Sequence, residues 1–140
     1  MERQARRDIE HFVRGTLGCR CPDGVFRDIA LETRTSPEGA SRYARIAIGG
    51  KLLIYILDPA DADPGDGVVV ELARLGVAER DRLGFNRFRL AMAAPAGGDP
   101  RRAAEAFAGA VGTDGKAHLH AVPARALPTQ LRGLARRSPA

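Results

Sequence analysis

The chain has 140 residues, of which 44% are hydrophobic and 28% charged, and it contains only two cysteines. These proportions are typical of one ordinary globular domain, and two cysteines are too few for the disulfide framework of a small secreted protein. No apolar run is long enough to span a bilayer, and the N-terminus lacks the apolar segment of a secretory signal, so we expect a cytoplasmic protein without a membrane partner.

The formal net charge of +5 comes from the end of the chain. Residues 1–114 contain 17 basic and 17 acidic side chains, and no acidic residue follows Asp114. A basic tail is usually a solvated end, and here it is the one feature that favours nucleic-acid binding. Base stacking needs exposed aromatic rings, whereas the chain has five Phe and two Tyr, several of them at expected core positions. The composition therefore argues against a nucleic-acid partner. If the protein does bind nucleic acid, we expect the basic tail to make the contact.

Residues 3–16 are predicted to form an amphipathic helix that packs on the sheet. Its charged side chains fall away from one apolar side, at the spacing of a helix with 3.6 residues per turn. Gly18 then stands where a residue of left-handed conformation commonly ends a helix. The apolar side contains Ala5, Ile9, Phe12, Val13 and Thr16.

Three strands are predicted between residues 29 and 57. Apolar and polar side chains alternate over 29–34 and again over 43–48, as they do in half-buried strands. Gly49 and Gly50 fit a two-residue hairpin, in which both residues take positive φ angles. The following run, 52–57, is apolar on both faces, so we expect it at the centre of the sheet.

The second half of the chain alternates helices and strands. Helices are expected to begin at Asp63 and Asp99, each of which precedes a proline, and to end at Gly84 and Gly112. The strands that follow them cover residues 87–92 and 116–122. Crossovers of this kind are right-handed and make the strands parallel. One face of the helix expected between Asp63 and Gly84 carries Val68, Val69, Leu72, Leu75, Gly76 and Leu83.

The predicted fold class is therefore α/β, at the border with α+β. A five-stranded mixed sheet consists of an antiparallel meander, about 28–58, that continues into a parallel β-α-β-α-β unit, about 51–122. Residues 1–122 form one domain, and residues 123–140 form a tail rich in Ala, Pro and Arg. The helical spacing of Leu127, Leu131 and Leu134 leaves two alternatives for the tail, which are a docked short helix and a loose end.

Cys19 and Cys21 form a Cys-x-Cys motif and are the first candidate site. Such a pair can ligate one soft metal ion such as zinc or iron, act as a redox dithiol, or close a small disulfide ring. Pro22 suits the first position of a helical turn, which would place Cys21 at its N-cap. That position and Arg20 lower the pKa of a thiol, whereas Asp23 opposes them. The alternative is that both cysteines are small, partly buried residues of a tight connection.

Two further groups could hold a metal ion. His118 and His120 project from one face of a strand, and with the two cysteines they would complete a zinc or iron site. Nothing in the sequence brings the two pairs together, and paired histidines on a strand more often form a polar face. An acidic loop could bind Mg²⁺ or Ca²⁺, but its spacing does not match a calcium loop and favours a solvated loop instead. Its candidate ligands are Asp58, Asp61 and Asp63.

Arg87 and Arg89 lie two residues apart on a predicted strand and form a candidate anion site, with Lys51 or Arg45 beside them depending on strand order. Solvated strand edges account for these arginines equally well. The chain has no phosphate-binding glycine loop and no Gly-x-Ser-x-Gly elbow, which argues against nucleotide enzymes and serine hydrolases.

Two functions are consistent with this sequence. The first is a small thiol or soft-metal module that works through its Cys-x-Cys motif. The second is a binding or assembly module without catalysis, in which the sheet face and the basic tail hold a protein, a second copy of the chain or an anionic partner. Neither motif is specific for a reaction, and the balance of the residues favours a protein that is not an enzyme.

Overall fold

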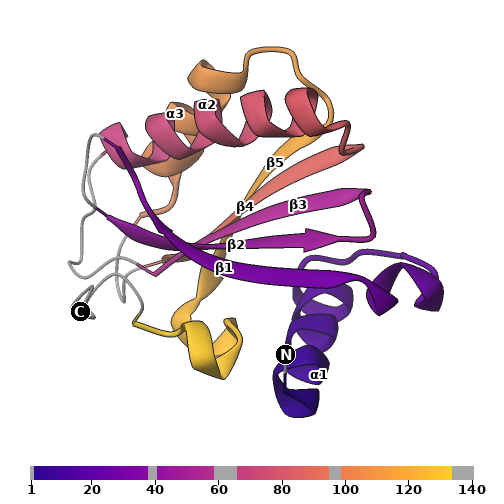
Figure 1. The fold of residues 1–140 in the computed structure, drawn as a ribbon. Coiled ribbons are helices and arrows are strands. Elements are labelled where there is room, and N and C mark those ends of the chain that lie inside the picture. The colour runs from indigo at the N-terminus through magenta and orange to yellow at the C-terminus, as the bar shows by residue number, and fades with distance from the viewer. Residues whose placement is uncertain (1, 38–40, 59–65, 95–98, 134–140) are drawn as a thin grey trace.

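A five-stranded mixed sheet with the strand order β1-β2-β3-β4-β5 organises the chain (Figure 1). The structure is a computed structural model, and it describes residues 2–37, 41–58, 66–94 and 99–133. The strands are β1 (Ile29–Thr35), β2 (Arg42–Ile48), β3 (Leu52–Leu57), β4 (Arg87–Ala94) and β5 (Ala117–Pro123). The α-helices are α1 (Arg3–His11), α2 (Asp66–Leu83) and α3 (Arg101–Val111).

The direction of the strands changes in the middle of the sheet. β1, β2 and β3 pair antiparallel, whereas β3, β4 and β5 pair parallel through the crossovers that contain α2 and α3. Gly49 and Gly50 have φ angles of 57° and 65° and form the tight hairpin between β2 and β3. The predicted fold class is confirmed, including the continuation of an antiparallel meander into a parallel unit.

Helices cover both faces of the sheet. Figure 1 shows α2 and α3 together on one face, and α1 with the C-terminal segment on the other. β3 is buried along its whole length, as its apolar side chains predicted. The two faces give two core clusters. The cluster under α1 includes Ile9, Phe12, Ile46, Ile54 and Leu131, and the cluster under α2 and α3 includes Leu53, Leu72, Phe88, Leu90 and Phe107.

The N-terminal helix packs on the sheet as predicted. Ile9, Phe12 and Val13 are buried, and the helix continues from α1 into a π-helical turn, η1 (Phe12–Thr16). Gly18 follows with a φ angle of 72°, the left-handed conformation expected where a helix ends. The next amide, that of Cys19, donates a hydrogen bond of 3.0 Å to the carbonyl of Val13. The start of the cysteine segment is thus fixed to the end of the helix.

The segment after β5 docks on the sheet without forming an α-helix. It makes two short 3-10 turns, η3 (Ala124–Ala126) and η4 (Thr129–Leu131), and Pro128 between them interrupts the backbone hydrogen bonding that a longer helix needs. Leu127 and Leu131 are buried in the same core cluster as α1, and Leu134 lies outside the described residues. The described part of the tail, up to residue 133, therefore packs on the core under α1.

The helix α2 departs from its predicted apolar face at its C-terminal end. Leu83 was expected on the buried side, but it is 49% exposed because it is the last residue of α2, where the chain turns away at Gly84. The predicted start of this helix at Asp63 lies outside the described residues. No helix in the described ranges is long and apolar enough to cross a membrane.

Candidate functional site

A cavity of about 400 Å³ lies beside the cysteine pair and collects basic side chains from three separate segments. One wall is the connection 18–21, which contains both cysteines and Arg20. The second wall is the start of β3 with Lys51, and the third is the start of β4 with Arg87 and Arg89. The described lining therefore contains four basic residues and no acidic one.

The strand register explains why these residues meet. β3 and β4 are parallel, with Leu52 opposite Arg87 and Ile54 opposite Arg89. Leu52 and Ile54 belong to the core under α1, so both arginines project from the face that α1 covers. The guanidinium of Arg89 reaches the end of the helix and donates a hydrogen bond of 2.9 Å to the carbonyl of Leu17. This contact holds the cysteine segment against β4.

No acidic side chain of the described residues forms an ion pair with the basic groups of the cavity. Arg20, Lys51 and Arg87 are exposed, and none of them forms an ion pair with an acidic side chain in the part of the chain that the structure describes. Burial and the neighbouring charge of Arg87 lower the pKa of Arg89. Its Nε atom is buried and has no hydrogen-bond partner among the described residues. A bound anion would relieve both conditions, because it supplies a negative charge and hydrogen-bond acceptors.

Asp23, the acid that follows the cysteine pair in the sequence, is paired with an arginine. The side chain of Asp23 is 98% exposed, and its carboxylate accepts a hydrogen bond of 2.6 Å from Arg14. The sequence predicted that Asp23 would oppose the positive groups around the cysteine pair. In the structure Arg14 offsets the charge of this carboxylate, and the described lining of the cavity, to which both cysteines belong, contains basic groups and no acidic one.

Cys19 and Cys21 are joined by a disulfide, with their Cα atoms 5.4 Å apart. This is one of the three chemistries that the Cys-x-Cys motif allowed. Both residues are half-buried and pack against the core under α1. The predicted N-cap position of Cys21 is wrong, since the 3-10 turn η2 (Asp23–Arg27) begins after Pro22, whose backbone is extended. The carbonyl of Pro22 accepts the first hydrogen bond of that turn, which leaves Cys21 one residue outside it.

His118 and His120 support the two arginines from the neighbouring strand. The Nε2 atom of His120 lies 3.0 Å from the guanidinium of Arg89, and that of His118 lies 3.5 Å from the guanidinium of Arg87. An arginine can only donate, so these ring nitrogens accept and carry no proton. Burial, with the charges of Arg89 and Arg87, lowers the pKa of His118. Burial, Arg89 and His118 lower the pKa of His120 to about 4.

The structure does not bring the predicted metal ligands together. Among the described residues no three His, Cys, Asp or Glu side chains lie where one metal ion could bind them, so the cysteine and histidine pairs do not share a site. A soft-metal site at the cysteines alone stays a prediction, and it requires the disulfide to open because thiolates are the ligands. Asp58 is buried and accepts a hydrogen bond from the amide of Gly133, whereas Asp61 and Asp63 lie outside the described residues.

Arg45, the alternative neighbour of the two arginines, lies on the opposite face of the sheet. It is 8% exposed and donates a hydrogen bond of 3.0 Å to Glu79 of α2, which is 5% exposed. Tyr55 and Arg34 also donate to this carboxylate, at 2.6 Å and 3.1 Å. This cluster was not predicted from the sequence. Its signal was that Glu79 follows Leu72 and Gly76 on the buried side of α2, which is an unusual position for an acid.

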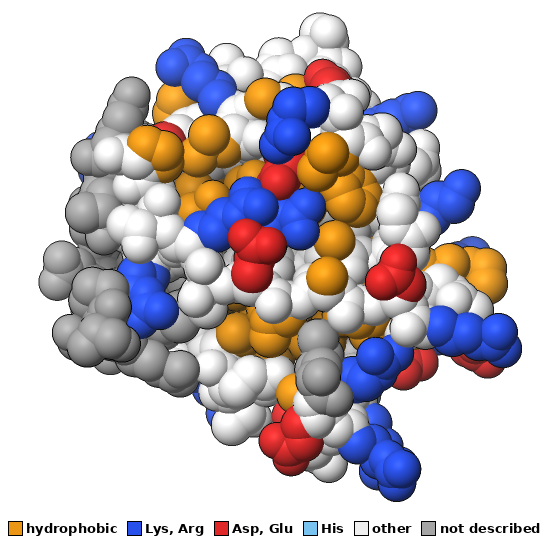
Figure 2. All heavy atoms as spheres, viewed as in Figure 1, with side chains coloured by type: hydrophobic (Ala, Val, Ile, Leu, Met, Phe, Trp, Pro, Cys, Tyr) orange, Lys and Arg blue, Asp and Glu red, His pale blue; other side chains and the backbone are white. Residues whose placement is uncertain are grey.

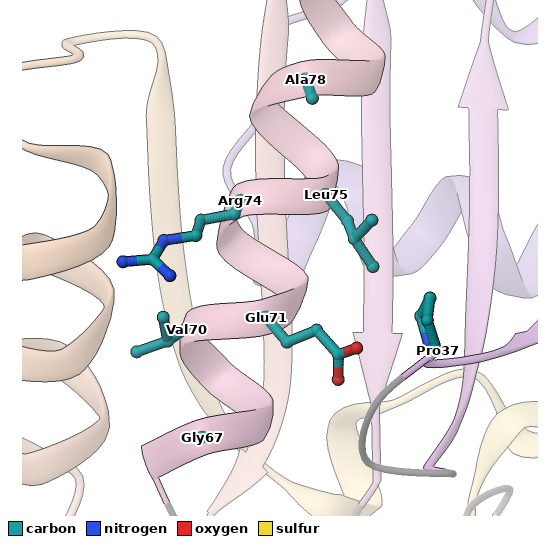
Figure 3. Close-up of a pocket in the computed structure, with 7 residues that line it drawn as sticks. All are labelled: Pro37, Gly67, Val70, Glu71, Arg74, Leu75 and Ala78. Atoms are coloured by element: carbon teal, nitrogen blue, oxygen red, sulfur yellow. The ribbon is translucent and has the colours of Figure 1, made fainter.

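A second cavity, of about 620 Å³, runs along α2 and is mainly apolar (Figure 3). Glu71 and Leu75 point toward Pro37 there, while Val70 and Arg74 point to the other side of the helix. Its described lining contains no histidine and no cysteine. On the face drawn in Figure 2, basic side chains lie among acidic ones. The cavity at the cysteine pair differs from both surfaces, because its described lining is basic and includes sulfur.

Comparison of the chain with models of protein families, with curated proteins and with solved structures gives no match. The geometry of the chain itself is therefore the basis on which a function is proposed below.

Proposed function

We propose that this protein is a binding module for a small anion, which it holds in the basic cavity beside the cysteine pair. The observation that carries this proposal is the convergence of Arg20, Lys51, Arg87 and Arg89 on one cavity without an acidic partner in the described lining. Like charges repel one another, and each basic group that the fold gathers here lowers the stability of the free protein. An anion that neutralises them recovers this free energy on binding.

The geometry favours carboxylates or phosphates as the bound group. Arginine presents its N–H donors in a planar fork that matches two oxygen atoms of such groups, and Lys51 adds a mobile point charge at the rim. The Nε atom of Arg89, which has no partner among the described residues, is one donor that the ligand can satisfy. A volume of about 400 Å³ fits a small organic anion.

A nucleic-acid strand fits this cavity less well. Sequence-tolerant binding of single strands uses aromatic side chains on which the bases stack. The described lining contains no aromatic residue, and besides the basic residues and the cysteines it has only Gly18, Leu52 and Asn86. The proposed ligand is thus a compact anion whose charged group enters the cavity.

The test is calorimetric titration of the purified protein with citrate and with inorganic phosphate at low ionic strength. We expect saturable binding of at least one of these anions, weakened about tenfold or more by the double substitution Lys51→Ala, Arg87→Ala. Both side chains are exposed, so this variant should fold normally. The matched control, Arg3→Ala with Arg74→Ala, removes two exposed positive charges that do not line the cavity.

The control should bind within about twofold of the parent protein, because distant surface charges are screened. Absence of saturable binding by the parent protein would refute the proposal. Equal weakening in the two double variants would also refute it, since the attraction would then come from the net charge and not from the cavity.

A further inference from the structure

We propose that the Cys19–Cys21 disulfide exchanges with small thiols that carry a negative charge, and that the basic cavity selects these thiols by their charge. The inference rests on the proposed function, because the same cavity would bind the anionic group of the thiol. It adds an activity to that function and names the substrate class, which is a compact thiol with a carboxylate or a similar anion.

The first support is the shared wall. Both cysteines line the cavity, and the residue between them, Arg20, lines it as well. Lys51, Arg87 and Arg89 also line it. A molecule that occupies the cavity therefore lies against the disulfide and against the basic side chains at the same time. The bound charge therefore brings an anionic thiol close to the disulfide, which favours their reaction.

The second support is the anchoring of the disulfide segment. On its N-terminal side, the amide of Cys19 is bonded to Val13 and the carbonyl of Leu17 to Arg89. On its C-terminal side, the guanidinium of Arg6 donates to the carbonyls of Phe26 and Arg27 at 2.8 Å and 3.0 Å. Opening of the S–S bond therefore leaves the backbone on both sides tied to α1 and β4. The two sulfur atoms stay near the cavity in both oxidation states.

The chemical step is an ordinary thiol–disulfide exchange. The thiolate of the small molecule attacks one cysteine sulfur, the Cys19–Cys21 bond breaks, and the other cysteine leaves as a thiolate. A second small-molecule thiolate then attacks the small-molecule sulfur of the mixed disulfide. A bond forms between the two small molecules, and the second cysteine leaves as a thiolate. The net result is two reduced cysteines and one small-molecule disulfide, so two electrons pass from the thiols to the protein. The reverse sequence closes the ring again, and no further oxidant is needed.

Electrostatics decides which thiols react. Negative charge is present on the attacking sulfur and develops on the leaving sulfur, and positive groups nearby stabilise both. A thiol with a carboxylate gains additional attraction, a neutral thiol gains none, and a thiol with an ammonium group is repelled. The carboxylate of Asp23, which would act in the opposite sense, is held by Arg14.

The experiment compares three thiols of similar size, which are mercaptopropionate, mercaptoethanol and cysteamine. Intact mass first verifies the disulfide, and the rate of its opening is then followed by acid quenching, alkylation and mass spectrometry. Each rate is divided by the rate of the same thiol with a small neutral disulfide at the same pH, which removes differences in thiol pKa and nucleophilicity.

We expect the normalised rate for mercaptopropionate to exceed that for cysteamine by about tenfold or more at low ionic strength. This ratio should fall toward one in about 1 M NaCl, where the Debye length is about 3 Å. It should fall likewise in the Lys51→Ala, Arg87→Ala variant, but persist in the Arg3→Ala, Arg74→Ala control. A ratio near one in the parent protein would overturn the inference.

Citrate titration of a Cys19→Ser, Cys21→Ser variant separates this inference from the proposed function. If this variant still binds citrate and the parent protein shows charge-selective exchange, both proposals are supported. Citrate binding without charge selectivity in the exchange overturns the inference and leaves the anion-binding function intact. Absence of saturable binding of both citrate and phosphate by the parent protein, together with a rate ratio near one, overturns both.

Discussion

The guanidinium of Arg89 donates a hydrogen bond of 2.9 Å to the backbone carbonyl of Leu17, a residue 72 positions earlier in the chain. Leu17 is buried at the end of the N-terminal helical segment, directly before Gly18 and the cysteine pair. One arginine thus belongs to the cavity and also fixes the backbone that forms its wall. The same residue carries a lowered pKa from burial and from Arg87, so its charge lies in an environment that does not favour it.

Arg89→Met should therefore change the free energy of unfolding by only about 1 kcal/mol, because the lost hydrogen bond is offset by removal of a poorly solvated charge. Its affinity for citrate should fall about tenfold or more. Arg45→Met on the other sheet face should cost about 3 kcal/mol or more, since it leaves the buried carboxylate of Glu79 with fewer partners. Urea denaturation of both variants tests this contrast, and equal losses of stability would contradict it.

Glu79→Gln should destabilise the fold by about 3 kcal/mol at neutral pH, because Arg45 and Arg34 lose the carboxylate that neutralises them. Burial raises the pKa of Glu79, but hydrogen bonds from Tyr55, Arg45 and Arg34 outweigh it, so the pKa lies below its ordinary value. A lowered carboxyl pKa stabilises the fold above the unfolded value of about 4.3 and loses this effect as the pH falls further. The difference in stability between parent and variant should therefore stay constant from about pH 7 to 5 and shrink below about pH 4. A difference that persists unchanged in acid would refute this explanation.

Gly76→Ala and Gly109→Ala should have opposite effects on stability. A Cβ atom at Gly76 would overlap the ring of Phe88, because α2 crosses β4 closely at this point. We expect a loss of about 1–3 kcal/mol from overpacking. Gly109 is exposed within α3, where no atom lies within 4 Å of an added Cβ, so alanine should stabilise the helix by about 0.5–1 kcal/mol. Thermal unfolding measures both, and a stabilising Gly76→Ala would show that the helix can move away from the sheet.

His120 should remain neutral in the folded protein well below the pH at which an ordinary histidine is protonated. Burial, the charge of Arg89 and the neighbouring His118 lower its pKa to about 4. Between about pH 6.5 and this value the unfolded chain binds a proton that the folded chain does not. The free energy of unfolding therefore decreases as the pH is lowered through this range. His120→Gln should remove part of this slope. An imidazole NMR titration checks the pKa directly, and a midpoint near 6.5 for His120 would show that its contact with Arg89 does not control it.

The fold was predictable from local patterns. Alternation over 43–48, the apolar run 52–57 and the glycines at 49 and 50 each determine an element by its own chemistry, and the right-handed crossover rule then joins the elements. Two local predictions were wrong, at positions where the conformation of adjoining residues determines the structure. The burial of Leu83 depends on where the chain turns, and the N-cap of the turn after Cys21 depends on the backbone of Pro22.

The candidate site was predictable only in pieces. The sequence indicated Cys19 and Cys21 as one candidate and Arg87 and Arg89 as another, without a reason to combine them. Their meeting depends on the strand order, which places Lys51 and not Arg45 beside the arginines, and on the face of the sheet that α1 covers. Both are properties of long-range packing that no local spacing encodes. The acid at Glu79 shows the same limit, because its partners come from three strands.

The order of the strands in the sheet is also the order in which they are synthesised. Each strand pairs with the one before it, so we expect a nascent chain to extend its sheet one strand at a time, across a hairpin turn at Gly49 and Gly50 and across the helical crossovers that contain α2 and α3. The core under α1 is different, because Ile9 and Phe12 share it with Leu127 and Leu131 from the other end of the chain. That core is complete only when synthesis has passed residue 131. The cysteines next to α1 are therefore made early but acquire their final environment last.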